Sequence, residues 1–246
     1  MAAYGVGIHN FETPQVSGEL DFIRRLSHLQ AAPTVFDIGA HKGDYTRLVK
    51  THIPNSRVFA FEPHPETYRR LVHEVGTLCE TFQLALSDSV SEATLFDRHP
   101  TTGTEHATLL PRIIDEVHGV RDVHQWSVAT TTLDDFMLQH SIEHIQLLKI
   151  DTEGTEMQVL RGAKAALLKG SIDLIQVEFN SMNVFSRTFF ADYRDLLHNY
   201  HPYRLLPDGL LPLVPYNPML HEIFGFQNLL FVAAGMPDSE RHMLTV

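Results

Sequence analysis

The feature that most constrains the fold of this chain is a regular alternation of short apolar segments with amphipathic helical ones. A β-type run begins at Thr34 and ends at Asp37-Ile38-Gly39, and strand and helix then alternate along most of the chain. Strands that are apolar on both faces and separated by helices are typical of a mostly parallel sheet covered on both sides. The predicted helices are Asp44–Thr51, Pro65–Val75, Leu133–Gln139 and Glu156–Leu168, and the further strands are Arg57–Phe61, Phe82–Leu86, Ala93–Phe96, Ser127–Thr131, Ile145–Ile150 and Ile172–Phe179.

The C-terminal part has a different pattern. Three β-type runs, Tyr203–Leu206, Leu210–Val214 and Asn228–Val232, are separated by Pro- and Gly-rich turns with no helix long enough for a crossover. Such connections predict antiparallel strands at the end of the sheet. No repeat or linker marks a boundary, so we expect one domain over residues 1–246. Its expected parts are an N-terminal helical extension (1–32), which covers a sheet edge or a neighbouring subunit, a catalytic core (33–233) and a C-terminal tail (234–246).

Charge and composition argue against several classes of protein. A formal net charge of −11 argues against binding to nucleic acid or to an anionic membrane by bulk charge. The single cysteine, Cys79, excludes an internal disulfide and a Cys-based zinc cluster. No apolar run approaches the roughly 20 residues that span a bilayer, and the N-terminus lacks a secretory pattern. We therefore expect a soluble, cytoplasmic protein; no pattern indicates its oligomeric state.

Acidic residues and glycines follow the predicted strands at the edge where α/β sheets bind ligands. The first turn is Gly-x-x-x-Gly, from Gly39 to Gly43, and lacks the central glycine that lets a backbone approach a pyrophosphate. Asp37 would repel a phosphate but suits a cationic group, and Glu62 ends the next strand, where a carboxylate can accept both hydroxyls of a ribose. A ribose without phosphates and with a cationic amino-acid tail describes S-adenosylmethionine.

Other interpretations of these residues remain open at this stage. The two glycines also suit any tight turn between a strand and a helix, and Asp88 is either a turn residue or an adenine contact. A nicotinamide-dependent oxidoreductase is supported only by the strand–helix pattern and Glu62. A non-catalytic cofactor-binding scaffold is the third alternative, although a degenerate enzyme would be expected to have lost some of Asp37, Glu62 or Asp151.

Several motifs together resemble the FkbM-type S-adenosylmethionine-dependent methyltransferases over about residues 34–232. The generic part is the first glycine turn, and the more specific part is the segment Leu148–Gly154 with the Leu133-Asp134-Asp135 helix before it. The resemblance implies a Rossmann-like class I α/β fold with helices on both faces of a mostly parallel seven-stranded sheet and an antiparallel C-terminal strand. It further implies O-methylation of a hydroxyl on a sugar, natural product or polysaccharide, with a small-molecule or glycan acceptor. Other motifs that fit are Phe61-Glu62-Pro63, Ala85-Leu86-Ser87-Asp88 and Asn228–Phe231.

The resemblance also implies roles for individual residues. Asp37, Gly39 and Ala40 would cradle the methionine part of the cofactor in the turn that Gly43 closes. Glu62, followed by Pro63, would hold the ribose, and Ser87 with Asp88 would lie against adenine.

Two further roles are predicted at the strand ends. An alcohol is a weak acid, so a base should take its proton during transfer; Asp151 is the first candidate, and His41 and His106 are weaker ones. Asp151 could instead cap the next helix or bind the cofactor's ammonium group. Asp151, Glu178 and Asn180 are hard oxygen ligands at adjacent strand ends and could hold Mg²⁺. Acceptor specificity is expected in Arg98–His124 and Pro202–Pro218.

Overall fold

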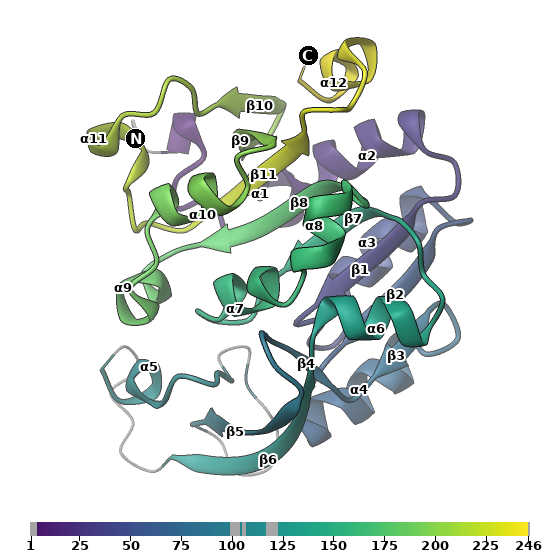
Figure 1. Ribbon diagram of the computed structural model, residues 1–246, viewed down its shortest axis with the longest axis vertical. Coiled ribbons are helices and arrows are strands. Elements are labelled where there is room, and N and C mark those ends of the chain that lie inside the picture. Colours follow the sequence, from purple (N-terminus) through teal and green to yellow (C-terminus); the bar gives the residue numbers. More distant parts are fainter. Residues whose placement is uncertain (1–3, 99–103, 105–106, 117–122, 246) are drawn as a thin grey trace.

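The computed structural model describes residues 4–98, 104, 107–116 and 123–245 of the chain. Its centre is an eight-stranded sheet with the order β10-β9-β11-β8-β7-β1-β2-β3 (Figure 1). Five neighbouring strands, from β3 to β8, are parallel. The strands of this sheet are β1 (Thr34–Ile38), β2 (Arg57–Phe61), β3 (Glu80–Phe82), β7 (Ile145–Ile150), β8 (Ile172–Phe179), β9 (Tyr200–Leu206), β10 (Gly209–Pro212) and β11 (Gln227–Ala233).

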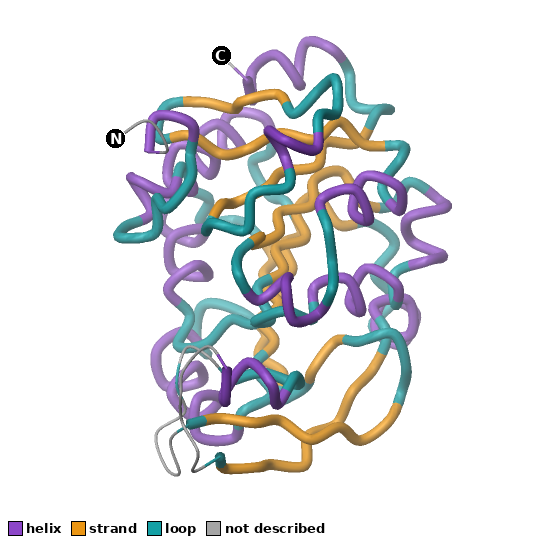
Figure 2. The backbone as a smooth tube through the Cα atoms, turned by 90° about the vertical axis from the view of Figure 1, so that its left-hand side faces the viewer, coloured by secondary structure: helices purple, strands orange, loops and turns teal. Residues whose placement is uncertain are grey.

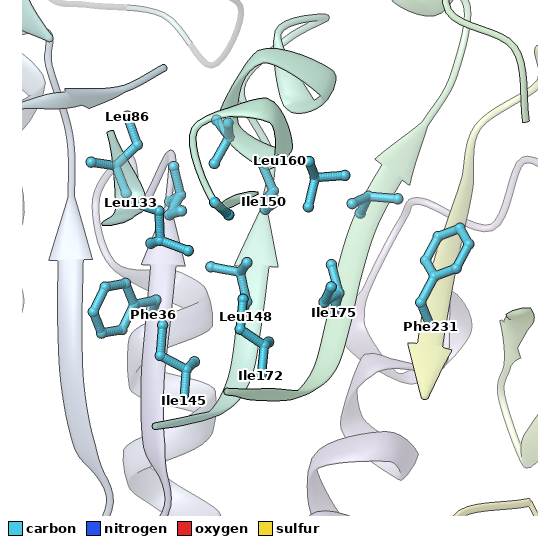
Figure 3. Close-up of a cluster of buried hydrophobic side chains, with 14 of the residues drawn as sticks. Phe36, Leu86, Leu133, Ile145, Leu148, Ile150, Leu160, Ile172, Ile175 and Phe231 are labelled. Carbon is cyan, nitrogen blue, oxygen red and sulfur yellow. The ribbon is translucent and has the colours of Figure 1, made fainter. Parts of the chain in front are cut away.

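Helices cover both faces of the sheet, as the apolar strands predicted (Figure 2). One face packs on α2, α3 and α12 through residues such as Ile23, Val49 and Leu244. The other face packs on α6, α7, α8 and α10, and Figure 3 shows Phe36, Leu148, Ile175 and neighbouring side chains in that cluster. The main helices are α2 (Glu19–Leu29), α3 (Asp44–His52), α4 (Pro65–Val75), α6 (Leu133–Gln139), α7 (Glu156–Arg161), α8 (Lys164–Lys169), α10 (Phe190–Leu196) and α12 (Asp238–Thr245).

The antiparallel end of the sheet is larger than the family resemblance implied. β11 runs antiparallel to both β8 and β9, and β9 forms a hairpin with β10. The sheet has eight strands where seven were expected: six from β3 to β11, and the two strands of the hairpin beyond β11. The three β-type runs predicted in the C-terminal part are all present as strands.

A second sheet of three strands, in the order β4-β6-β5, lies beside the main one, at the bottom of Figure 1. It consists of β4 (Ala85–Leu86), β5 (Ser91–Asp97) and β6 (His124–Thr131), with the short helix α5 (Pro111–Glu116) nearby. The predicted strands Ala93–Phe96 and Ser127–Thr131 therefore pair with each other, not with the main sheet.

The helix predicted over Glu156–Leu168 is broken in two at Gly162-Ala163. A Cβ at Gly162 would lie 2.0 Å from the carbonyl oxygen of Ser87, so the chain passes too close for a side chain. The Asp134 carboxylate accepts hydrogen bonds from the backbone N–H groups of Ala165 and Ala166, at 2.7 and 2.9 Å, and caps α8. This contact is a structural role for the Leu-Asp-Asp motif.

The remaining helices are short or lie near the ends of the chain. They are the 3₁₀ turn η1 (Tyr4–Val6), α1 (Pro14–Ser17), α9 (Met182–Ser186) and α11 (Pro218–His221). Within the described residues, we find no helix with the length and apolarity that crossing a membrane requires.

Candidate active site

A cavity of about 660 Å³ opens at the carboxyl ends of the parallel strands. The strand order reverses between β1 and β7, and this switch point is where α/β sheets bind ligands. Eight of the residues that we predicted from the sequence line the cavity, namely Gly39, Ala40, His41, Glu62, Pro63, Asp151, Glu178 and Asn180. The structure therefore brings together the candidate ribose, methionine and proton-transfer residues.

The turn after β1 requires glycine at its first position. Gly39 has φ of 78°, and a Cβ there would lie 1.7 Å from the carbonyl oxygen of Asp151. The N–H groups of Gly39 and Ala40 both donate to the carbonyl of Phe61, at 3.0 and 2.9 Å. Together with the Asp151 N–H, which donates to the Ile38 carbonyl at 2.9 Å, they hold the ends of β1, β2 and β7 together. Gly43, which closes the turn, packs instead on Val75 and does not line the cavity.

Glu62 lies buried beside this turn and is oriented by the backbone. Its two carboxylate oxygens accept the N–H groups of His41 and His64, at 3.0 and 2.8 Å. Burial raises the pKa of Glu62 to about 7, although these two hydrogen bonds counter part of the rise. A carboxylate fixed in this way still has lone pairs for the hydroxyls of a ligand.

Asp37 does not face the cavity, in contrast to the prediction. It is completely buried, where Thr46 donates a hydrogen bond to it at 2.7 Å. The structure places Asp37 inside β1, one residue before the strand ends, so that its side chain points toward α3. Its other carboxylate oxygen lies 3.5 Å from the Lys149 ammonium.

Lys149 links Asp37 to the cavity. Its ammonium lies 3.1 Å from the Asp151 carboxylate and 5.2 Å from the centre of the Tyr45 ring. Burial by itself would lower the pKa of Lys149, but the charges of Asp151, Asp37 and Glu19 outweigh it and raise the pKa. Lys149 is therefore a permanent cation, and Asp151, whose side chain is 30% exposed, presents its charge to the cavity.

Glu178 and Asn180 contact each other at the end of β8. The Asn180 amide donates to the Glu178 carboxylate, and its oxygen accepts the N–H of Met182 at 2.7 Å. Burial, followed by the charges of Asp151, Glu153 and Glu156, raises the pKa of Glu178 well above its ordinary value. Within the described part of the chain, no group of three or more His, Cys, Asp or Glu side chains could hold a metal ion. The predicted Mg²⁺ site is not supported.

Three further predicted residues are not part of the described cavity lining. Ser87 and Asp88 do not line the cavity; Leu84, Ala85 and Leu86 line it there instead. The Ser87 carbonyl approaches Gly162. His106 lies outside the described residues. Sequence reasoning missed His9, Phe11, Glu19 and Phe226, which line the cavity from both ends of the chain. No motif marks these residues, since only the folded chain brings them to the site.

The region that carries this site matches the family model described as "Methyltransferase FkbM domain" over residues 37–205. The chain belongs to this FkbM methyltransferase family. A nicotinamide-dependent oxidoreductase is therefore not favoured.

Two relatives of this chain are named as methyltransferases. The 2-O-methyltransferase NoeI of Sinorhizobium fredii is 30% identical over 148 residues, which are 56% of this chain and 60% of NoeI. The hexuronic acid methyltransferase AglP of Haloferax volcanii is 26% identical over 169 residues, 67% of this chain and 63% of AglP. The chain thus spans about 60% of the length of these relatives.

A solved structure supports the same fold. The crystal structure of methyltransferase FkbM from Methylobacillus flagellatus aligns with a TM-score of 0.51 at 12% identity, and covers 89% of this chain and 50% of that chain. At this level of identity, the likeness concerns the Rossmann-like fold alone.

Proposed function

We propose that this FkbM-family protein transfers a methyl group from S-adenosylmethionine to a hydroxyl of a small molecule or glycan. The observation that carries the proposal is the buried Glu62 carboxylate, fixed by two backbone N–H groups at the rim of a cavity at the switch point. The names of NoeI, a 2-O-methyltransferase, and AglP, a hexuronic acid methyltransferase, support an acceptor that bears hydroxyl groups. A cytoplasmic location stays a prediction.

Different residues of this chain would bind the ribose, methionine and adenine parts of the cofactor. The Glu62 carboxylate would accept hydrogen bonds from the ribose hydroxyls. Gly39 and Ala40 leave room for the methionine part, because no side chain larger than a methyl group stands in that stretch. Adenine would pack on the apolar stretch Leu84–Leu86, which lines the cavity where Ser87 and Asp88 were expected.

Asp151 is the residue that we propose as the general base. The bound cofactor supplies an electrophilic methyl group on a sulfonium, so the protein has to align the acceptor hydroxyl and take its proton. The Lys149 ammonium, at 3.1 Å, pairs with the Asp151 carboxylate and holds it at the edge of the cavity. His41, which also lines the cavity, is the second candidate.

The acceptor would lie toward the second sheet. Leu95 of β5 and the following residues Thr104, Ala107 and Leu109 line the cavity. They belong to or adjoin the Arg98–His124 stretch in which we expect acceptor specificity. By contrast, the described cavity lining includes no residue of Pro202–Pro218.

The proposed activity is tested with S-adenosylmethionine and a panel of saccharides and small hydroxylated compounds. We expect S-adenosylhomocysteine to form only when an acceptor is present, and the acceptor to gain one methyl group by mass spectrometry. Thermal-shift measurements with S-adenosylhomocysteine and NAD⁺ provide the control. Stabilisation by NAD⁺ alone would contradict the proposal.

The affinity for S-adenosylhomocysteine should depend on pH through Glu62. The raised pKa means that Glu62 holds a proton below about pH 7, and a carboxyl that keeps its proton cannot accept both ribose hydroxyls. Affinity should therefore fall as the pH drops through 7, approaching about tenfold per pH unit. Isothermal titration calorimetry would measure Kd across this range. The Glu62→Gln variant, whose amide does not titrate, should bind S-adenosylhomocysteine more weakly, and its affinity should no longer depend on pH in this range. If the variant kept the same pH dependence, Glu62 would not be its cause.

A further inference from the structure

The N-terminal segment forms part of the cavity wall although it precedes the region that matches the family. The His9 N–H donates to the carbonyl of Phe226 at 2.8 Å, and the Phe11 ring meets the Phe226 ring edge-on at 5.8 Å. His9, Phe11 and Glu19 all line the cavity. The segment is thus attached at the start of β11 and reaches the cavity at the carboxyl edge of the parallel strands. Figures 1 and 2 show the N-terminal segment beside this end of the sheet.

Gly18 determines where Glu19 enters the site. It separates α1 from α2 with φ of 86°, and a Cβ there would lie 2.4 Å from the carbonyl oxygen of Leu206. The chain is therefore pressed against β9 at this point and turns directly into α2, whose first residue is Glu19. This turn points the Glu19 side chain at the cavity.

The Glu19 carboxylate is held by two donors. One oxygen accepts the Ser17 hydroxyl at 2.9 Å, and the other accepts the Gln176 amide N–H at 3.0 Å. Gln176 is itself buried and oriented, because its amide oxygen accepts the Tyr45 hydroxyl at 2.7 Å. Two fixed donors hold the carboxylate in place beside the cavity, so its position depends little on a bound ligand.

The charges around Glu19 favour a cationic ligand group. Glu19, Asp37 and Asp151 all interact with the Lys149 ammonium, so three carboxylates share one cation in this group of described residues. Glu19 also lines the cavity together with Gly39, Ala40 and Tyr45, on the side of the first turn. A ligand ammonium placed there would offset part of the excess negative charge.

We propose that Glu19 accepts a hydrogen bond from the α-ammonium group of the bound cofactor. The N-terminal segment then supplies one of the residues that bind the cofactor. The inference rests on the proposed function, since it assumes an S-adenosyl cofactor in this cavity. Glu62 would hold the ribose on one side of the turn, and Glu19 would hold the amino-acid end on the other. Asp37, predicted to hold the methionine part, is turned away from the cavity and lies 3.5 Å from the Lys149 ammonium.

The test compares two ligands that differ at the amino-acid end. S-adenosylhomocysteine and 5′-methylthioadenosine share the adenosine and the sulfur, but only the first carries an ammonium group. Glu19→Gln should raise the Kd of S-adenosylhomocysteine by about tenfold or more, because hydrogen bonds to charged groups contribute at least that factor to affinity. The Kd of 5′-methylthioadenosine should stay unchanged. Glu12→Gln, the same change at an exposed position of the same segment, should alter neither Kd.

Each outcome of this titration is informative. Equal weakening of both ligands would show a structural role for Glu19 and overturn the inference, as would unchanged binding of S-adenosylhomocysteine. Failure of the wild-type protein to bind either ligand would instead overturn the proposed function. Should Glu19→Gln not fold, Glu19→Asp provides the second variant. Aspartate keeps the charge on a shorter side chain. The inference requires this variant to raise the Kd of S-adenosylhomocysteine more than the Kd of 5′-methylthioadenosine.

Discussion

Asp151→Asn is expected to lower kcat for methyl transfer by about 10²- to 10⁴-fold, the range that loss of a general base produces. The amide has nearly the same shape as the carboxylate, but it cannot accept the proton of the acceptor hydroxyl. Asparagine also keeps an oxygen for the Lys149 ammonium, which lies 3.1 Å from Asp151 in the native protein. The fold and the affinity for S-adenosylhomocysteine should therefore change far less than turnover. Steady-state kinetics and calorimetry would measure these two quantities separately.

Glu178→Gln is the matched comparison for this variant. Glu178 lies on the same cavity, but its raised pKa, caused by burial and by neighbouring carboxylates, means that it is more readily protonated than an ordinary glutamate. We expect this substitution to reduce kcat much less than Asp151→Asn. The reverse order would assign proton transfer to Glu178 and contradict the role of Asp151. Equal turnover in the wild type and both variants would direct attention to His41.

Gly39→Ala is expected to destabilise the protein by roughly 3 kcal/mol or more, because overpacking and a left-handed backbone act together. The new Cβ would lie 1.7 Å from the carbonyl oxygen of Asp151, and φ is 78°. The contact joins β1 to β7, so the backbone cannot yield without separating two central strands. For a chain of this size, the change in Tm should be roughly 6–12 °C.

Gly170→Ala separates the two causes. Gly170 also has positive φ, 65°, but no atom lies within 4 Å of where its Cβ would stand. We expect a loss of only about 1 kcal/mol there, from the backbone conformation alone. Chemical denaturation of both variants would measure the difference. Equal losses would mean that the close approach of β1 and β7 at Gly39 relaxes without cost.

Local pattern was sufficient wherever a residue's role depends on its own strand or turn. The alternation of apolar strands and helices predicted the parallel sheet, because burial on both faces requires helices on both sides. Gly39 and Glu62 were placed correctly at the cavity, since the turn after a parallel strand always lies at the same edge of the sheet. The hairpin of β9 and β10 was predicted for the same kind of reason, because a short turn allows only an antiparallel neighbour.

The direction of the Asp37 side chain depends on whether the strand ends at Asp37 or one residue later, at Ile38. The strand continues to Ile38, and because side chains alternate between faces, Asp37 points to α3 and not into the cavity. The break at Gly162 had a more distant cause, because the Ser87 carbonyl lies 2.0 Å from where a Cβ at Gly162 would stand. The spacing of residues along the sequence predicts neither the exact end of β1 nor the contact between Ser87 and Gly162.

The sequence by itself determined the fold class, the FkbM family and the edge of the sheet at which the site lies, because these follow from periodicity and from residues next to strand ends. Only the tertiary structure decided which charges meet there. Glu19 contacts Gln176, 157 positions further along the chain, and Lys149 joins Asp37 to Asp151. Such pairs form because the sheet and α2 bury them together, and buried charges must find partners wherever in the sequence these lie.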